Sequence, residues 1–266
     1  MTDEIKRLKE IIDGSSNIVF FGGAGVSTES GIPDFRSADG LYSQKLNRNY
    51  SPEELVSHGF YVHHGEEFFR FYKSHLIYPQ AKPNPCHKAL AELEKQGKVR
   101  AVVTQNIDGL HQAASSKNVF ELHGSVLRNF CESCGAFYDE KFILAADGIP
   151  LCPKCGGRVK PDVVLYGESL NNQVVVGAIR SIEQCETLII GGTSLIVYPA
   201  AGMIDYFAGK NLVLINKTET SADGKADLII RENIGEVFSA VMQPFFQKGC
   251  GFFHGKIKGR LDIAFR

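Results

Sequence analysis

A short apolar run that ends in a glycine-rich turn constrains this chain more than any other feature. Residues 18–21 (IVFF) have the composition of a buried strand. Gly23-Ala24-Gly25 follows, and Ser27, Thr28 and Ser30 then offer hydroxyls near an expected helix start. Glycines allow a sharp turn and a close approach of phosphate to backbone N–H groups. The pattern predicts a cradle for a pyrophosphate, although a plain turn remains an alternative because the third glycine of the dinucleotide fingerprint is missing.

Further apolar runs alternate with helical patterns along the chain. Their Val, Ile and Leu content predicts strands that are buried on both faces, as in a parallel sheet. The expected strands are 17–21, 100–104, 119–122, 187–191, 211–215 and 227–230. Helical patterns lie between them at 87–96, 174–184 and 199–208. Such alternation predicts an α/β, doubly wound parallel sheet, whose ligands bind at the carboxyl ends of the strands.

The composition bounds the class of protein. The 266 residues are 44% apolar, which is enough for a proper core. A net charge of −1 gives no general attraction to nucleic acid or anionic membranes. No apolar run reaches the roughly 18 residues that a membrane span needs. The charged N-terminus reads as a surface helix rather than a signal peptide, so we expect a cytoplasmic protein.

Two stretches interrupt the alternation and predict a smaller domain. We expect a Rossmann-like domain from 1–37, 83–126 and 161–243. Residues 38–82, with helical patches at 53–58 and 66–75, form the expected helical insertion, and 127–160 contain two cysteine pairs. Residues 244–266 show no clear period, and we expect a poorly ordered tail of unknown role.

The cysteine pairs are the most specific signal that spacing alone provides. Cys131-x2-Cys134 and Cys152-x2-Cys155 stand 17 residues apart, as in tetrahedral zinc sites. Four thiolates fill the coordination shell, whereas a catalytic zinc keeps one position open. We therefore expect one structural Zn²⁺ that holds a ribbon too small to fold by its own core. Buried or redox-active thiols are the weaker alternative.

Polar residues gather where the predicted strands end. Gln105, Asn106 and Asp108 follow one strand, and His123 follows the next. A histidine freed by the adjacent Gly124 can serve as a general base near neutral pH. His111 could be a core residue as easily as a ligand. Gly192-Thr193-Ser194 and Asn216-Lys217-Thr218 close two further strands and suit contacts to phosphate and ribose.

Several long motifs, taken together and in order, resemble those of the sirtuins, specifically the bacterial-type NAD-dependent protein lysine deacetylases. The resemblance covers about residues 13–238. The motifs are GAGVSTESGIPDFRS, TQNIDGLH, ELHGS, the two CxxC pairs, KPDVVLYGE, GTSLIVYPA and INKT.

The resemblance implies a Rossmann-like domain and a smaller domain made of a helical insertion and a zinc ribbon, with NAD and acyl-lysine entering the cleft between them. It implies His123 as the catalytic base. The implied NAD contacts are Ala24, Thr28, Phe35, Arg36, Gln105, Asn106, Ile107, Asp108, His123, Gly192, Thr193, Ser194, Asn216 and Ile234. The implied peptide contacts are Val163, Tyr166, Gly167 and Glu168, which pair with the substrate backbone by strand addition.

The implied reaction transfers the acyl group from lysine to the ribose of NAD. Nicotinamide leaves, the acyl oxygen attacks the sugar carbon, and His123 deprotonates a ribose hydroxyl. The products are nicotinamide, O-acetyl-ADP-ribose and free lysine. A mono-ADP-ribosyltransferase and a non-catalytic NAD-binding module are the competing readings.

Departures from the family pattern bear on substrate choice. Gly22 stands where many relatives have Thr, and Tyr166 replaces the commoner Phe. Relatives that prefer acidic acyl groups have a Tyr-x-x-Arg pair in the helical insertion, and residues 69–75 (FRFYKSH) contain none. Burying an acidic acyl group without a cation is costly, so we expect acetyl or another uncharged acyl group. The expected partners are acyl-lysine proteins or peptides, with no nucleic acid and no membrane, and we expect a monomer.

Overall fold

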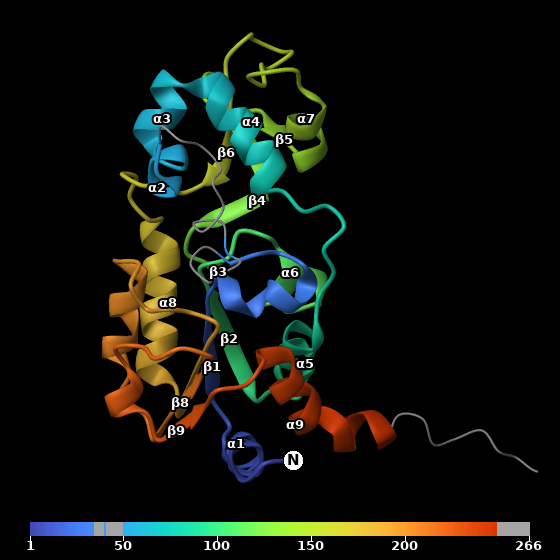
Figure 1. Cartoon of the computed structure of the whole chain (residues 1–266), viewed down its shortest axis with the longest axis vertical. Coiled ribbons are helices and arrows are strands. Elements are labelled where there is room, and N and C mark those ends of the chain that lie inside the picture. The colour runs from blue at the N-terminus through green and yellow to red at the C-terminus, as the bar shows by residue number, and fades with distance from the viewer. Residues whose placement is uncertain (35–39, 41–49, 249–266) are drawn as a thin grey trace, which may run out of the picture.

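The computed structural model describes residues 1–34, 40 and 50–248, and its centre is a six-stranded parallel sheet (Figure 1). The strand order is β3-β2-β1-β7-β8-β9. The bounds are Ile18–Gly22 for β1, Val99–Thr104 for β2, Val119–Glu121 for β3, Thr187–Gly191 for β7, Asn211–Ile215 for β8 and Leu228–Ile230 for β9. All six expected strands are present, and the order reverses between β1 and β7, as in doubly wound folds.

Helices cover both faces of this sheet because successive strand residues point to opposite sides. Ile18 and Phe20 of β1 pack with α1 (Asp3–Gly14), α5 (Pro85–Lys95) and α9 (Ile234–Lys248). Val19 and Phe21 pack with α8 (Asn172–Gln184) and the 3₁₀ helix η3 (Ala200–Tyr206) on the other face. The two faces are visible on either side of the strands in Figure 1. The confirmed fold class is therefore α/β with a Rossmann-like sheet.

Two details differ from the sequence patterns. The helical pattern at 199–208 is confirmed as a helix, and residues Ala200–Tyr206 form it as a 3₁₀ helix. Helix α9 runs to Lys248 and so extends past residue 243, where we expected the tail to begin. Residues 249–266 lie outside the described part of the chain.

A second, antiparallel sheet lies beyond the carboxyl ends of the main strands (Figure 1). Its order is β5-β4-β6, with β4 at Gly124–Cys131, β5 at Phe137–Tyr138 and β6 at Val159–Val163. Among the described residues, four helices accompany it: α2 (Pro52–Leu55), α3 (His58–His63), α4 (Gly65–His75) and α7 (Glu140–Ala145). These elements share a separate apolar core that is rich in aromatic residues.

The helical patch expected at 53–58 is wrong as a single element. Helix α2 ends at Leu55, and α3 begins at His58. Ser57 separates them because its side chain accepts a hydrogen bond from Phe60 N, which caps α3. Ser57 also forms a parallel bridge with Tyr166. None of the described helices is long and apolar enough to cross a membrane.

Candidate functional site

The loops that follow β1 and β7 interlock at the reversal point of the sheet. Gly23 N donates to Gly191 O at 3.1 Å, and Gly25 N donates to Gly192 O at 2.8 Å. A Cβ atom at Gly25 would lie 2.8 Å from Gly192 Cα, so the close approach requires glycine there. The chain then forms two short 3₁₀ helices, η1 (Ala24–Val26) and η2 (Thr28–Ser30), where we expected one α-helix to start.

The loop after β1 is held by a residue that the sequence reasoning missed. Buried Asn84 donates to Val26 O at 2.7 Å and to Ser30 Oγ at 3.0 Å, and its Oδ1 caps α5. An Asn-Pro pair just before a helical pattern marks a helix cap, so the cap could have been found; the contact to a loop 58 residues away could not. Ala24 is half-buried and Thr28 is exposed in this loop. The predicted contacts Phe35 and Arg36 lie outside the described residues.

Polar side chains from the ends of β1 and β2 form one connected cluster. Asn106 Nδ2 donates to Ser27 Oγ at 3.0 Å, and Ser27 Oγ donates to Asp108 Oδ2 at 2.6 Å. Leu110 N donates to the other carboxylate oxygen of Asp108 at 2.9 Å. Burial raises the pKa of Asp108, although these two hydrogen bonds oppose the shift. The sequence did not single out Ser27 as the link between Asn106 and Asp108.

The third loop joins the same cluster. Gln105 Nε2 donates to Thr193 Oγ1 at 3.1 Å, which connects the ends of β2 and β7. Gly192 has a left-handed φ of 60°, and half-buried Ser194 follows Thr193. Half-buried Asn216 lies at the end of β8 and donates to Thr218 O.

Two further predicted cofactor contacts lie on other elements. Ile234 begins α9 and lies against Gly191. A Cβ atom added to Gly191 would lie 2.4 Å from Ile234 Cδ1. Ile107 leads toward the smaller sheet, since its carbonyl accepts from Val126 N at 2.9 Å. Its side chain packs against the small apolar core. The predicted cofactor residues that the structure describes thus lie at the carboxyl edge of the main sheet or beside it.

His123 is oriented by the backbone. Its Nδ1 lies 2.9 Å from Gln105 O, and a carbonyl oxygen can only accept. Nδ1 therefore carries the proton, which leaves Nε2 as the basic nitrogen. Burial lowers the pKa of His123, although the hydrogen bond to Gln105 opposes the shift. The ring is thus neutral at pH 7 and can accept a proton at Nε2.

His111 is a core residue. It is 1% exposed, and its ring centroid lies 4.7 Å from that of His87, which is also fully buried. Within the described part of the chain, neither ring nitrogen of His111 has a hydrogen-bond partner. Burial lowers the pKa of His111 to about 3 and that of His87 to about 4. Of the two alternatives for His111, a core residue or a ligand contact, the structure therefore favours the core residue.

The predicted peptide-binding segment runs from the end of β6 into the next loop. Val163 is buried, Tyr166 is 40% exposed and Gly167 has a φ of 91°. Tyr166 N donates to Val56 O at 3.0 Å, and His58 N donates to Tyr166 O at 2.9 Å. One edge of the segment is therefore already paired with the helical insertion.

The four predicted metal ligands come together. All four sulfur atoms of Cys131, Cys134, Cys152 and Cys155 lie within 4.8 Å of one another. Sulfur atoms of a tetrahedral Zn–S₄ site with bonds of about 2.3 Å are separated by about 3.8 Å, so the set fits zinc. Tyr138 Oη lies 3.0 Å from Cys152 Sγ, and this hydrogen bond lowers the pKa of Cys152 to about 6.

The strand order of the parallel sheet reverses at a glycine-rich cradle, and a four-cysteine ribbon is joined to this sheet. These features define a zinc-containing α/β protein of the dinucleotide-binding class. Residues 23–199 match the model of the Sir2 family. A NAD-dependent protein deacetylase of Clostridium perfringens is 67% identical over 91% of this chain and 100% of its own length. A second, from Clostridium acetobutylicum, is 55% identical over 91% and 99%. The chain belongs to the Sir2 family, as the resemblance predicted.

Solved structures agree with this assignment. A Sir2 protein with a deacetylated p53 peptide and 3′-O-acetyl ADP ribose has a TM-score of 0.83 and 38% identity, covering 90% of this chain and 98% of its own. A complex titled "Sir2-p53 peptide-NAD+" has a TM-score of 0.79 and 38% identity, covering 93% and 100%.

Proposed function

We propose that this protein uses NAD to remove acetyl groups from protein lysines, giving nicotinamide, O-acetyl-ADP-ribose and free lysine. The observation that carries the proposal is the position of His123. Its Nδ1 is held by Gln105 O, and Gln105 also binds Thr193 of the loop after β7. The base is therefore fixed to the same loops that form the dinucleotide cradle.

NAD fits the described residues because the cradle has no room for side chains. Thr193 Cβ lies 2.7 Å from where a Cβ of Gly23 would be, so the loops after β1 and β7 approach each other with the closeness that a glycine-rich dinucleotide cradle needs. In the proposed roles, Gln105 and Asn106 approach the nicotinamide ribose, and Ile107 and Asp108 hold the carboxamide. His123 Nε2 accepts a proton from a ribose hydroxyl of the bound co-substrate.

The zinc in this proposal is structural. Four sulfur ligands complete a tetrahedral shell, which leaves no position for a water nucleophile. The metal instead stabilises the ribbon that supports β4 and β6. The expected division into two domains, with boundaries at 38, 83, 127 and 161, remains part of the proposal.

The preference for an uncharged acyl group is also a proposal. Tyr72 is fully buried in the small core, and Arg70 on the same helix is exposed. They are separated by two positions, so they do not lie on one face of α4. Turnover of succinyl-lysine peptide faster than acetyl-lysine peptide would contradict this preference.

One incubation separates the candidate activities. An acetyl-lysine peptide is mixed with the protein, with and without NAD, and mass spectrometry follows peptide and nucleotide. We expect loss of acetyl and formation of O-acetyl-ADP-ribose only with NAD, and no turnover by a folded His123→Ala variant. Addition of ADP-ribose to the peptide would instead indicate a mono-ADP-ribosyltransferase. No turnover by folded, zinc-loaded protein would favour a non-catalytic NAD-binding module.

We also propose that the protein acts as a cytoplasmic monomer on acyl-lysine proteins, without nucleic acid or membrane. The net charge of −1 supports the absence of a general attraction to polyanions. Size-exclusion chromatography with light scattering tests the monomer.

A further inference from the structure

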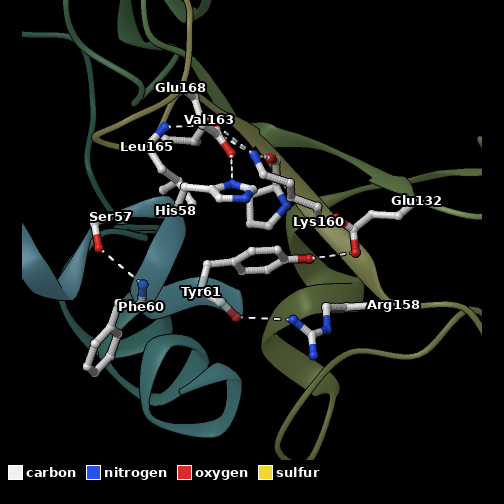
Figure 2. Close-up of polar contacts among 11 residues, drawn as sticks. Ser57, His58, Phe60, Tyr61, Glu132, Arg158, Lys160, Val163, Leu165 and Glu168 are labelled. Atoms are coloured by element: carbon white, nitrogen blue, oxygen red, sulfur yellow. Dashed lines mark hydrogen bonds and ion pairs between the residues drawn. The ribbon is translucent and has the colours of Figure 1, made fainter. Parts of the chain in front are cut away.

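The carboxylate of Glu168 turns into the protein. It accepts hydrogen bonds from His58 Nδ1 at 2.8 Å, Lys160 Nζ at 3.1 Å and Leu165 N at 3.0 Å (Figure 2). Glu168 therefore has three partners, from α3, β6 and its own loop. Burial acts to raise the pKa of Glu168, but hydrogen bonds from Leu165, His58 and Lys160 outweigh it and lower the pKa. The carboxylate is thus ionised and held in place.

His58 is the partner that ties this loop to the helical insertion. The residues are 110 positions apart in sequence, and the backbone hydrogen bond from His58 N to Tyr166 O lies beside the side-chain contact. The side chain of His58 is 53% exposed and that of Glu168 is 20% exposed. The contact thus lies at the surface end of the segment expected to receive the peptide.

The helix that presents His58 is itself fixed to the zinc ribbon. Tyr61, one turn further along α3, donates its hydroxyl to Glu132 at 2.9 Å, and its carbonyl accepts from Arg158 at 3.1 Å (Figure 2). The guanidinium of Arg158 also lies 5.1 Å from the centre of the Tyr61 ring. Glu132 lies between the first two zinc ligands, and Arg158 follows the fourth. His58 is therefore presented by a rigid support.

We propose that His58 and Glu168 form a positioning pair that holds segment 163–168 in the conformation that receives the acyl-lysine peptide. This inference rests on the proposed function. Recognition by strand addition depends on a fixed row of backbone donors and acceptors. When a loop becomes ordered only on binding, the entropy cost of ordering weakens the affinity for the peptide. A loop that is already ordered does not carry this cost. The pair acts on peptide binding and leaves the NAD site and the chemical step unchanged.

The test is a double-mutant cycle with His58→Ala, Glu168→Ala and the double variant. His63→Ala is the matched control, because His63 is exposed on the same helix. Steady-state assays with acetyl-lysine peptide give kcat and the KM for peptide and for NAD, with zinc content and Tm measured in parallel. We expect His58→Ala to raise the peptide KM roughly tenfold, the size of a lost hydrogen bond to a charged group. Glu168→Ala should raise it at least as much, because it also removes the contacts to Lys160 and Leu165.

The double variant should raise the peptide KM no more than Glu168→Ala alone, because loss of the carboxylate already breaks the pair with His58. Zinc content, kcat and the KM for NAD should stay within about twofold. His58→Asn, which can place an amide nitrogen near the Nδ1 position, should restore most of the peptide affinity. If one of these variants fails to fold, the peptide KM of His58→Asn is compared with that of His58→Leu instead.

Three outcomes overturn the positioning pair: a peptide KM for His58→Ala equal to that for His63→Ala, fully additive effects in the double variant, or a parallel loss of NAD affinity. Each of these requires an active wild-type enzyme. Absence of NAD-dependent deacetylation by the wild type would instead overturn the proposed function, so the two failures are distinguishable.

Discussion

Acidification should destabilise this protein through two neighbouring core histidines. His87 and His111 are buried with ring centroids 4.7 Å apart, and Asn84 N donates to His87 Nδ1 at 3.3 Å. Burial lowers the pKa of His87 to about 4 and that of His111 to about 3, while both return to about 6.5 on unfolding. The unfolded chain therefore binds more protons below pH 6.5. Stability should fall from about pH 6.5 down to about pH 4 through both rings, and on to about pH 3 through His111 alone.

The magnitude follows from the linkage between proton binding and folding. Each ring that stays neutral in the folded chain costs about 1.4 kcal/mol per pH unit below pH 6.5. Between pH 7 and pH 5 the loss is about 2 kcal/mol for each ring and about 4 kcal/mol for the pair. A typical domain has about 5–15 kcal/mol of stability, so the loss is large.

Urea unfolding at pH 7, 6 and 5 with excess zinc measures this loss. The variant His111→Gln, which keeps similar volume but cannot be protonated, should lose about 2 kcal/mol less stability than the wild type over the same range. Protonation of the zinc ligands affects both proteins equally and cancels in the comparison. His63→Gln, at an exposed site, should keep the wild-type dependence. Parallel pH dependences for wild type and His111→Gln would refute the reasoning.

Three further predictions concern the site. Because burial lowers the pKa of His123, kcat/KM should fall on the acid side only below pH 6.5, and an acid limb centred above 6.5 would contradict its role as the base. Cys131→Ala should release zinc and unfold the ribbon, seen as lost metal by mass spectrometry and a lower Tm, whereas a fully active, equally stable variant would argue against a structural metal. Gly192→Ala should raise the KM for NAD and lower Tm, since its Cβ would lie 2.3 Å from Val26 N. Gly148→Ala, also at positive φ but with nothing within 4 Å, should lower Tm alone; equal KM values for NAD in the two variants would exclude the cradle argument.

The elements with strong local patterns were predictable. The six parallel strands follow from short runs rich in Val, Ile and Leu, and the cysteine quartet follows from two CxxC pairs at a spacing that only a shared metal explains well. The antiparallel strands β4 and β6 were missed, because the ribbon is held by metal ligands and carries little apolar periodicity. The break between α2 and α3 was missed because Ser57 pairs with Tyr166, which is distant in sequence.

The sequence by itself determined the family, the parallel sheet and the chemical types at its carboxyl edge, because buried strands, glycine turns and paired cysteines leave local signatures. Only the tertiary structure decided the protonated nitrogen of His123, the burial of His111 and the contact between His58 and Glu168. Each of these depends on a partner or an enclosure supplied by a distant segment. Solvent exposure and hydrogen-bond partners belong to the packed molecule, so no local pattern encodes them.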